Sequence, residues 1–170
     1  MKLKKFRFKK VKSTNNTAIK IAKSLNYKCG MVISDTQLNG RGQYGKKWIS
    51  IKGNLFVSVF FKIDNRISIE RFTKLNCIKI KKILNFFIKK KIKIKYPNDL
   101  FVDNCKICGI LQETLFYKDK KFAIIGIGVN IVKSPKIENY PTTYMNNYVK
   151  GSIDKKKIFR LIKNSYEMRN

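Results

Sequence analysis

A glycine loop flanked by cations is the first stretch of this sequence whose residue types could do chemistry. Gly40, Gly42 and Gly45 fit the pattern G-x-G-x-x-G inside "NGRGQYGKKW" (39–48), and Arg41 and two lysines add positive charge. Glycines let backbone N–H groups approach an anion closely. On this segment alone, an anion-binding loop and a solvated lysine-rich turn both remain open.

The surroundings of this loop argue against two common phosphate-binding designs. A dinucleotide-binding loop needs a helix directly after it, whose N-terminus meets the pyrophosphate, whereas residues 48–62 are typical of a strand. Protein kinases place a glycine loop between two strands, but they also need a valine–alanine–lysine strand, a His-Arg-Asp loop and an Asp-Phe-Gly motif. The chain contains none of these three motifs and is too short for a kinase.

A second constellation lies in "KYPNDLFVDNCKICGIL". Lys95, Asn98 and Asp99 surround a proline where a strand ends, and Lys106 follows on the next strand, three residues before Gly109. A cation, an amide and a carboxylate on a rigid hairpin suit a nucleoside triphosphate and its Mg²⁺. The pattern therefore favours the anion-binding interpretation of the glycine loop as well.

Asn130 is a third candidate, because it lies among apolar residues in "IGIGVNI". A buried polar group without partners costs about 1–3 kcal/mol. Asn130 therefore either satisfies nearby backbone groups or presents its amide to a ligand, and the pattern leaves both roles open.

The absence of histidine restricts the chemistry further. It excludes the Ser-His-Asp and Cys-His nucleophile schemes, so catalysis must use Lys, Arg, carboxylates, amides or a metal on oxygen ligands. Of Cys29, Cys77, Cys105 and Cys108, only the last two have C-x-x-C spacing, and no second pair completes a zinc site. We interpret all four as buried thiols in a reducing cytosol.

Hydrophobic periodicity predicts the elements that must position these residues. One helix is predicted to begin at Ser13 as its N-cap, a second helix follows Ser68, and a third helix closes the chain. A hairpin turns at Asp103-Asn104, since both residue types tolerate positive φ. Strands are predicted over 3–11, 30–34, 54–62, 92–97, 100–111 (a hairpin whose second strand continues to about 116) and 122–132. This order predicts an α/β protein of the α+β type, with a mixed, mostly antiparallel sheet and helices packed on it.

Each predicted helix has one apolar face. The three faces are formed by Ala18, Ile21, Ala22 and Leu25; by Phe72, Leu75, Ile80, Ile83, Leu84 and Phe87; and by Ile153, Phe159, Leu161, Ile162 and Tyr166. A length of 170 residues is enough for one domain, which we place at 1–170.

The net charge of +29 would fit a nucleic-acid partner. However, Lys far outnumbers Arg and the lysines lie in every segment, which favours compositional drift and solvated faces over a dedicated nucleic-acid surface. No apolar run is long enough for a signal peptide or a membrane span. We therefore expect a soluble cytoplasmic protein with no specific nucleic-acid partner and no membrane partner.

Six motifs resemble, in the same order, those of the catalytic domain of biotin protein ligases, the biotin–[acetyl-CoA-carboxylase] ligases. They are "STNNTA" (13–18), "TQLNGRGQYGKKW" (36–48), "GNLFVS" (53–58), "KYPNDL" (95–100), "KICGILQET" (106–114) and "IGIGVN" (125–130). Any one of these could arise by chance, but six in register are highly specific. The resemblance implies the class II aminoacyl-tRNA synthetase/biotin synthetase fold.

The resemblance also implies a reaction in two steps. ATP adenylates the biotin carboxylate and releases pyrophosphate, and then a lysine of the biotin carboxyl carrier protein of acetyl-CoA carboxylase attacks biotinyl-5′-AMP and releases AMP. The implied small molecules are biotin, ATP and Mg²⁺, and a homodimer is left open.

Site residues follow from the matching motif positions. Lys106, Arg41 and Asp99 would be catalytic, with Asp99 also the candidate Mg²⁺ ligand. Biotin would be bound by Ser13, Thr14, Asn15, Gln37, Gly40, Arg41, Gly42, Lys106 and Gly109. ATP would be bound by Arg41, Gln43, Trp48, Lys95, Asn98, Asp99, Lys106 and Asn130. For Trp48, a role as a core anchor stays open, and Glu113 is expected to be a structural hydrogen-bonding residue.

The chain departs from the family pattern in several places. It starts at the catalytic domain and ends after the closing helix, so we expect neither a helix-turn-helix domain nor the small SH3-like C-terminal domain. Tyr96 replaces a usual Trp, and Gln43 stands where the loop often carries a second Arg. The alternatives are a lipoate–protein ligase or octanoyltransferase of the same fold, and a decayed basic nucleic-acid-binding protein.

Overall fold

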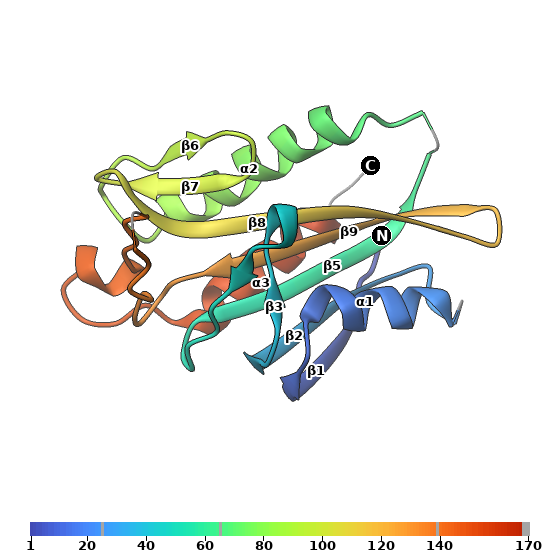
Figure 1. The fold of residues 1–170 in the computed structure, drawn as a ribbon, viewed down its shortest axis with the longest axis horizontal. Helices are drawn as coiled ribbons and strands as arrows, with labels where there is room; N and C mark the ends of the chain where they lie inside the picture. The colour runs from blue at the N-terminus through green and yellow to red at the C-terminus, as the bar shows by residue number, and fades with distance from the viewer. Residues whose placement is uncertain (25, 65, 139, 168–170) are drawn as a thin grey trace.

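The computed structural model describes residues 1–24, 26–64, 66–138 and 140–167, and a seven-stranded sheet forms its centre (Figure 1). The strand order is β1-β2-β5-β9-β8-β7-β6, in which β1 and β2 are parallel and all other neighbours are antiparallel. The strands are β1 (Lys4–Val11), β2 (Cys29–Gln37), β5 (Leu55–Ile63), β6 (Lys93–Lys95), β7 (Asp99–Val102), β8 (Cys105–Tyr117) and β9 (Lys120–Val129). The predicted mixed, mostly antiparallel sheet is confirmed.

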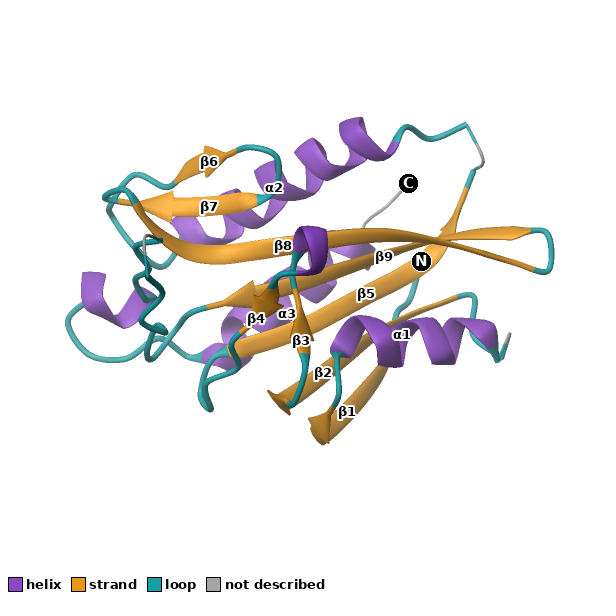
Figure 2. Ribbon diagram, in the orientation of Figure 1, coloured by secondary structure: helices purple, strands orange, loops and turns teal. Residues whose placement is uncertain are grey.

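Helices cover both faces of the sheet (Figure 2). The described residues form α1 (Thr14–Lys23), α2 (Ile69–Asn85) and α3 (Lys155–Glu167). One core lies between α1 and the sheet and includes Ala18, Ala22 and Phe60, while a larger core packs α2 and α3 on the opposite face. Because helices cover both of its faces, the central strand β5 is buried along almost its whole length, which explains its nearly continuous hydrophobic run.

Local chemistry begins and ends these elements as predicted. The side chains of Ser13 and Ser68 accept hydrogen bonds from the backbone N–H groups three residues ahead and cap α1 and α2. Asp103 and Asn104 have φ values of 47° and 59°, so the two-residue turn between β7 and β8 uses residue types that tolerate this conformation. A second two-residue turn, at Lys118 and Asp119, joins β8 to β9.

Two predictions about helix faces need correction. Leu75 was predicted on the buried face of α2, but 52% of its surface is exposed. The buried stripe instead follows Asn76, Ile80 and Leu84 at four-residue spacing, and Leu75 lies one position off that stripe. In α3 the sequence pattern missed Ile158, which is fully buried. Leu25, predicted on the apolar face of α1, lies outside the described residues.

A short ribbon stands apart from the main sheet. Its strands β3 (Gly40–Arg41) and β4 (Lys47–Trp48) pair with each other around the 3₁₀ turn η1 (Gln43–Gly45). Figure 1 shows this ribbon on the same side of the sheet as α1. The predicted glycine loop is therefore a small hairpin placed over the sheet, between two long strands of the chain.

The last strand ends earlier than predicted, and the chain then makes an excursion. Residue Val129 ends β9, although the pattern predicted a strand to 132. The chain returns beside Lys106, whose backbone N–H donates to Pro141 O (2.8 Å) and whose carbonyl accepts from Thr143 N (2.9 Å). This return continues the sheet where β9 has ended and leads into the 3₁₀ turn η2 (Met145–Tyr148).

No helix within the described parts of the chain is long and apolar enough to cross a membrane.

Candidate functional site

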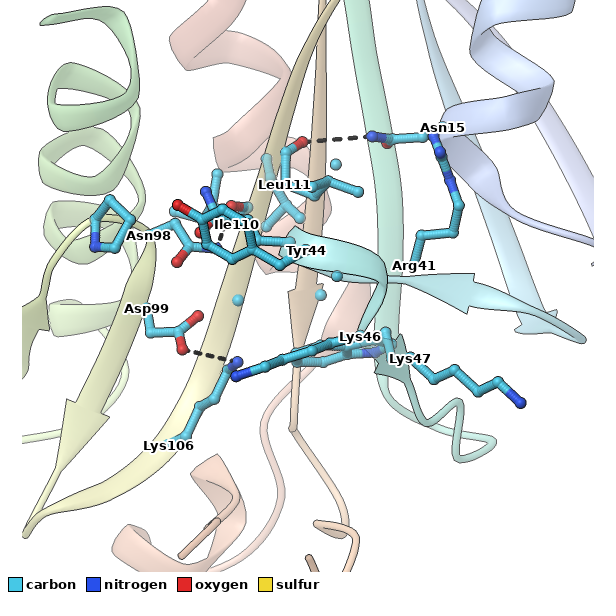
Figure 3. Close-up of a pocket in the computed structure, with 18 of the residues that line it drawn as sticks. Asn15, Arg41, Tyr44, Lys46, Lys47, Asn98, Asp99, Lys106, Ile110 and Leu111 are labelled. Atoms are coloured by element: carbon cyan, nitrogen blue, oxygen red, sulfur yellow. Dashed lines mark hydrogen bonds and ion pairs between the residues drawn. The ribbon is translucent and has the colours of Figure 1, made fainter. Parts of the chain in front are cut away.

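The site is a pocket of about 630 Å³ on the face of the sheet that carries α1 and the glycine loop. Its walls come from the first turn of α1, the end of β2, the glycine loop, the β6–β7 hairpin, strands β8 and β9, and part of the excursion after β9 (Figure 3). Segments separated by more than 100 residues therefore meet around one cavity.

Most of the predicted site residues line this pocket. They are Ser13, Thr14, Asn15, Gln37, Arg41, Gly42, Gln43, Trp48, Lys95, Asn98, Asp99, Lys106 and Gly109. The walls therefore contain every predicted catalytic residue and all but one residue from each of the two predicted ligand sets.

The two predicted residues outside the pocket walls are Gly40 and Asn130. A Cβ atom at Gly40 would lie 2.6 Å from the Trp48 carbonyl oxygen, so glycine is needed there for close backbone packing. The Asn130 side chain donates to Thr143 O (3.1 Å) and accepts a longer bond from Asn54 (3.4 Å). The sequence left open whether this amide bonds to neighbouring protein groups or to a ligand. In the structure it bonds to neighbouring protein groups.

One end of the pocket, which we call the neutral end, is built from Thr14, Asn15 and Gln37 with Ser58 behind them. The backbone N–H and the hydroxyl of Thr14 donate to Gln37 Oε1 (2.8 and 3.0 Å). The Ser58 hydroxyl lies 2.8 Å from Thr14 Oγ1 and 2.5 Å from Asn15 Oδ1. Gln37 Nε2 has no hydrogen-bond partner among the described residues, so its N–H groups are available to a ligand.

Glycines give the neighbouring side chains room against the sheet. A Cβ atom at Gly126 would lie 2.4 Å from Asn15 Oδ1, and Cβ atoms at Gly109 and Gly128 would lie 2.7 and 2.5 Å from the Trp48 ring. Trp48 therefore packs flat against two strands and forms part of the pocket wall. The sequence analysis missed Gly126 and Gly128, although glycines two residues apart on a buried strand indicate close approach on one face.

The opposite end, which we call the charged end, is centred on Lys106 and Asp99. Lys106 Nζ lies 2.9 Å from Asp99 Oδ2, and the Tyr140 hydroxyl donates to the same oxygen (2.6 Å). Asp99 is only 8% exposed, and its Oδ1 atom is buried without a hydrogen-bond partner in the described structure. Figure 3 shows Lys106 directed at Asp99 across the pocket from the neutral end.

Aromatic rings surround the lysines of the charged end. Lys106 Nζ lies 5.4 Å from the centre of the Trp48 ring and 5.3 Å from that of Tyr140. Lys95 Nζ lies 5.3 Å from the Tyr140 ring and 5.0 Å from the ring of Phe101. These contacts hold two ammonium groups near each other at the pocket, where they could meet the charges of a polyanion.

Burial around Asp99 keeps nearby groups protonated. Burial, followed by the hydrogen bond to Asp99, raises the pKa of Tyr140 above its usual value, so the phenol stays a donor. Burial also raises the pKa of the Cys77 thiol to about 11 and that of Cys108 well above its ordinary value. Two of the four thiols are buried as predicted, whereas Cys29 and Cys105 are only half-buried.

Arg41 takes a position that the sequence analysis did not predict. Its Nη2 donates to both carboxylate oxygens of Glu113 (2.6 and 2.5 Å), and Glu113 also accepts from Asn15 Nδ2 (2.7 Å). In Figure 3 the Arg41 side chain points toward Asn15, while Lys106 points to Asp99. The prediction that Glu113 is a structural hydrogen-bonding residue is confirmed.

Tyr44 and Tyr140 are pocket residues that the sequence analysis missed. Tyr44 has a φ of 53° in the η1 turn, lines the pocket, and is 89% exposed. The sequence could have indicated Tyr44, because this aromatic residue lies beside Gly45 within the glycine loop. Nothing in the local pattern around Tyr140 indicated its position, because it comes from the irregular segment after β9.

A metal site made only of protein groups is absent from the described residues, in which no three acidic, cysteine or histidine side chains converge. Two carboxylates among the described residues line the pocket, Asp99 and Glu138, and of the two it is Asp99 that has a buried oxygen without a partner. A single carboxylate fits Mg²⁺ that is held mainly by phosphate oxygens and water. It would not fit a metal that needs a complete protein cage.

Comparison with known proteins relates this arrangement to a family. Residues 7–130 match the model of the Biotin/lipoate A/B protein ligase family. The chain is 31% identical over 126 residues to biotin–protein ligase 1, chloroplastic, of Arabidopsis thaliana, covering 70% of this chain and 33% of that protein. It is 29% identical over 126 residues to the bifunctional ligase/repressor BirA of Bacillus subtilis, covering 72% of this chain and 39% of that protein. The chain thus spans about a third of the length of these relatives.

The fold is also similar to that of a solved structure. The biotin protein ligase from Aquifex aeolicus in complex with biotin and ATP superposes with a TM-score of 0.79 at 24% identity, covering 96% of this chain and 68% of that chain. This similarity confirms the predicted fold class.

Proposed function

The chain belongs to the biotin/lipoate A/B protein ligase family, and we propose that it is an ATP-dependent biotin protein ligase. The proposed reaction joins biotin to a specific lysine of the biotin carboxyl carrier protein of acetyl-CoA carboxylase. It proceeds through biotinyl-5′-AMP, because a carboxylate is a poor electrophile until adenylation supplies a leaving group.

The position of Lys106 is the observation that carries this proposal. Its ammonium group lies at the charged end of the pocket, across the cavity from the hydrogen-bonded neutral end. In the first step the biotin carboxylate must approach the α-phosphate of ATP, and a fixed cation between these two anions would stabilise the charge that develops. Lys106 is the residue best placed to supply it.

The neutral end suits the ureido ring of biotin. This ring is uncharged and has both hydrogen-bond donors and acceptors, as do Ser13, Thr14 and Gln37. Because Thr14 already occupies Gln37 Oε1, the Gln37 amide is oriented with its N–H groups free to donate. Gly109, which leaves room for the Trp48 ring, and Asn15, whose polar atoms are used within the protein, would support this wall.

The charged end would take the nucleotide. Trp48 would pack near the adenine, and Lys95 and Asn98 would contact the phosphates or the ribose. Asp99 Oδ1, which has no partner in the described structure, is the oxygen that would hold Mg²⁺. The metal ion, when bound, neutralises phosphate charge.

The glycine loop would close over the adenylate. Gly42 and Gln43 line the pocket, and the Gly42 N–H, which donates to Lys46 O (2.6 Å) in the ligand-free protein, would exchange this bond for one to the adenylate, with Gly40 allowing the close backbone packing of the loop. A closed loop would exclude water from the mixed anhydride, which hydrolyses readily.

In the second step the carrier lysine would attack the acyl carbon. A new C–N bond forms, the bond between the acyl carbon and the phosphate oxygen breaks, and AMP leaves with the electron pair. Asp99 is the candidate acceptor of the proton lost by the amine.

A direct assay tests the proposal. Purified protein is incubated with ATP and either biotin or lipoate, and the acyl-adenylate is measured by mass spectrometry. Carrier domain of acetyl-CoA carboxylase is then added, with and without ATP. We expect biotinyl-5′-AMP and ATP-dependent biotinylation of one lysine. Preferential formation of lipoyl-AMP would instead identify a lipoate ligase of the same family, and the absence of any adenylate would favour a decayed enzyme.

A further inference from the structure

The glycine loop is joined to the main sheet by an ion pair between Arg41 and Glu113. Strand β3 carries Arg41, and β3 pairs only with β4, outside the seven-stranded sheet. Glu113 lies on β8, and the Arg41 Nη2 atom lies within 2.6 Å of both its carboxylate oxygens. The side chain of Arg41 is 37% exposed and that of Glu113 is 26% exposed, so both are partly shielded from solvent.

The same carboxylate is connected to the neutral end of the pocket. Glu113 Oε2 accepts from Asn15 Nδ2 (2.7 Å), and Asn15 Oδ1 accepts from Ser58 (2.5 Å), whose hydroxyl also lies 2.8 Å from Thr14 Oγ1. Thr14 in turn bonds to Gln37, three residues before the loop begins. A continuous network of polar contacts therefore runs from the middle of the loop, through β8 and α1, back to the start of the loop.

Other charges of the loop do not make a comparable contact. Lys46 and Lys47 are exposed and form no ion pair with any described residue, and the hydrogen bond from Gly42 N to Lys46 O (2.6 Å) lies within the loop itself. Gln43, at the pocket wall, has no charge. Within the described structure, Glu113 is thus the one acidic residue that holds the loop by an ion pair.

We propose that Glu113 is a positioning residue that, through Arg41, keeps the glycine loop closed over the pocket. The order of the loop in the ligand-free protein depends on this ion pair. The retention of biotinyl-5′-AMP by the loop depends on it too, and this second consequence rests on the proposed function.

The first test measures the loop without any ligand. Glu113→Gln keeps the shape of the side chain and an acceptor for Asn15 but removes the charge that Arg41 binds. Hydrogen exchange is followed by mass spectrometry in peptides covering 38–50. We expect exchange there to be about tenfold faster in Glu113→Gln than in the wild type. Glu70→Gln, which removes the same charge from an exposed side chain near the start of α2, should exchange like the wild type. Unchanged exchange in Glu113→Gln would overturn the proposal.

A double substitution tests whether Glu113 acts through Arg41. If it does, Arg41→Gln alone should speed exchange in the loop by a similar factor, and adding Glu113→Gln should change it by less than about twofold. Effects that multiply would show that Glu113 acts by another route and would overturn the proposal.

The last test uses the adenylate. Biotinyl-5′-AMP is formed in the enzyme, excess biotin and ATP are removed, and release is timed. We expect Glu113→Gln to release the adenylate about tenfold faster than the wild type does. The rate at which the adenylate forms should change by a smaller factor. Equal release from a variant whose loop exchanges faster would overturn the role in retention. A wild type that forms no adenylate would refute the proposed function, while the exchange results would still decide the role of Glu113 in the loop.

Discussion

At the neutral end of the pocket, Thr14, Asn15 and Ser58 are hydrogen-bonded to one another or to their neighbours, whereas at the charged end Asp99 keeps a buried oxygen without a partner in the described structure. The neutral end is also formed by uncharged side chains, Thr14, Asn15, Gln37 and Ser58, while the charged end pairs Lys106 with Asp99. Before a ligand arrives, the side-chain oxygens of the first arrangement already have hydrogen-bond partners and Gln37 Nε2 is left as a free donor, whereas in the second arrangement a buried carboxylate oxygen has no partner in the described structure.

This difference indicates how the two ends would contribute to a two-substrate reaction. A network with its own hydrogen bonds already made is rigid and selects a ligand by shape and by the few donors left over, such as Gln37 Nε2. A lysine and a carboxylate with an unused oxygen can instead exchange partners when phosphates and a cation enter. We therefore expect substitutions at the two ends to affect different substrates and different kinetic constants.

The largest effect is expected from Lys106→Ala at the charged end. Removing the cation that would stabilise the developing charge should slow adenylation about a thousandfold. Pyrophosphate release with biotin and ATP measures this rate. Lys93→Ala, which removes an exposed lysine from β6, should have the wild-type rate. A Lys106→Ala variant that folds normally and still biotinylates a carrier domain would contradict the mechanism.

A smaller and more selective effect is expected from Thr14→Val at the neutral end. The substitution keeps the shape but removes the hydroxyl that donates to Gln37, which loosens the orientation of the Gln37 amide. The KM for biotin should rise about tenfold, while the KM for ATP should stay within about twofold. Thr114→Val on the exposed side of β8 is the matched control. Equal changes in both KM values would show that the two ends are not independent.

Gln43→Arg tests the loop that lies between the two ends. An added cation should hold the adenylate more firmly, so stray biotinylation of bystander lysines should fall by about two- to fivefold, as one partly exposed charge contributes little. Biotin on a mixture of unrelated proteins can be quantified by blotting. Equal leakage from both forms would indicate that Lys46 or Lys47 already supplies the charge.

The smallest effect concerns the Cys77 thiol behind the charged end, which donates to Pro97 O (3.5 Å). Burial and then the charge of Asp99 raise its pKa from 9.0 to about 11. Between these values the unfolded thiol ionises while the folded thiol stays neutral. The stability contributed by the neutral thiol is therefore complete below pH 9 and is lost as the pH rises toward 11.

Denaturant unfolding of the wild type and of Cys77→Ala at pH 8, 9 and 10 measures this contribution. The alanine variant should be less stable at pH 8 because of the cavity it creates, but its stability should fall less steeply with pH. Parallel pH profiles of the two proteins would mean that the thiol titrates normally in the folded state.

Much of the fold could be predicted because the signals were local. Ser13 as a helix cap and Asp103-Asn104 as a turn follow from the hydrogen bonds and backbone angles that these residue types favour. The exposure of Leu75 could not be predicted. An apolar residue next to the buried stripe of a helix looks the same in the sequence as a residue on that stripe, and only the packing of neighbouring elements decides which of the two is buried.

The site was predicted less completely, since some of its contacts depend on the tertiary structure. Tyr140 reaches Asp99 only because the irregular chain after β9 returns beside Lys106, and no periodicity marks such a return. The pairing of Arg41 with Glu113 joins residues 72 positions apart, and the sequence alone could not distinguish this partner from a ligand anion. Asn130 is buried as expected, but its amide is used by Thr143 and Asn54.

The return of the chain beside Lys106 also makes this protein suitable for engineering as a sensor. The excursion after β9 is held at its far end by the backbone bonds of Pro141 and Thr143 to Lys106, and at its near end by those of Asn130 and Ile131 to η2. Doubling the length of a flexible loop costs only about 0.6 kcal/mol. A fluorescent residue or a short peptide tag inserted between Lys136 and Ile137 would therefore sit at the rim of the pocket and signal its filling, without moving the lysine that would do the chemistry.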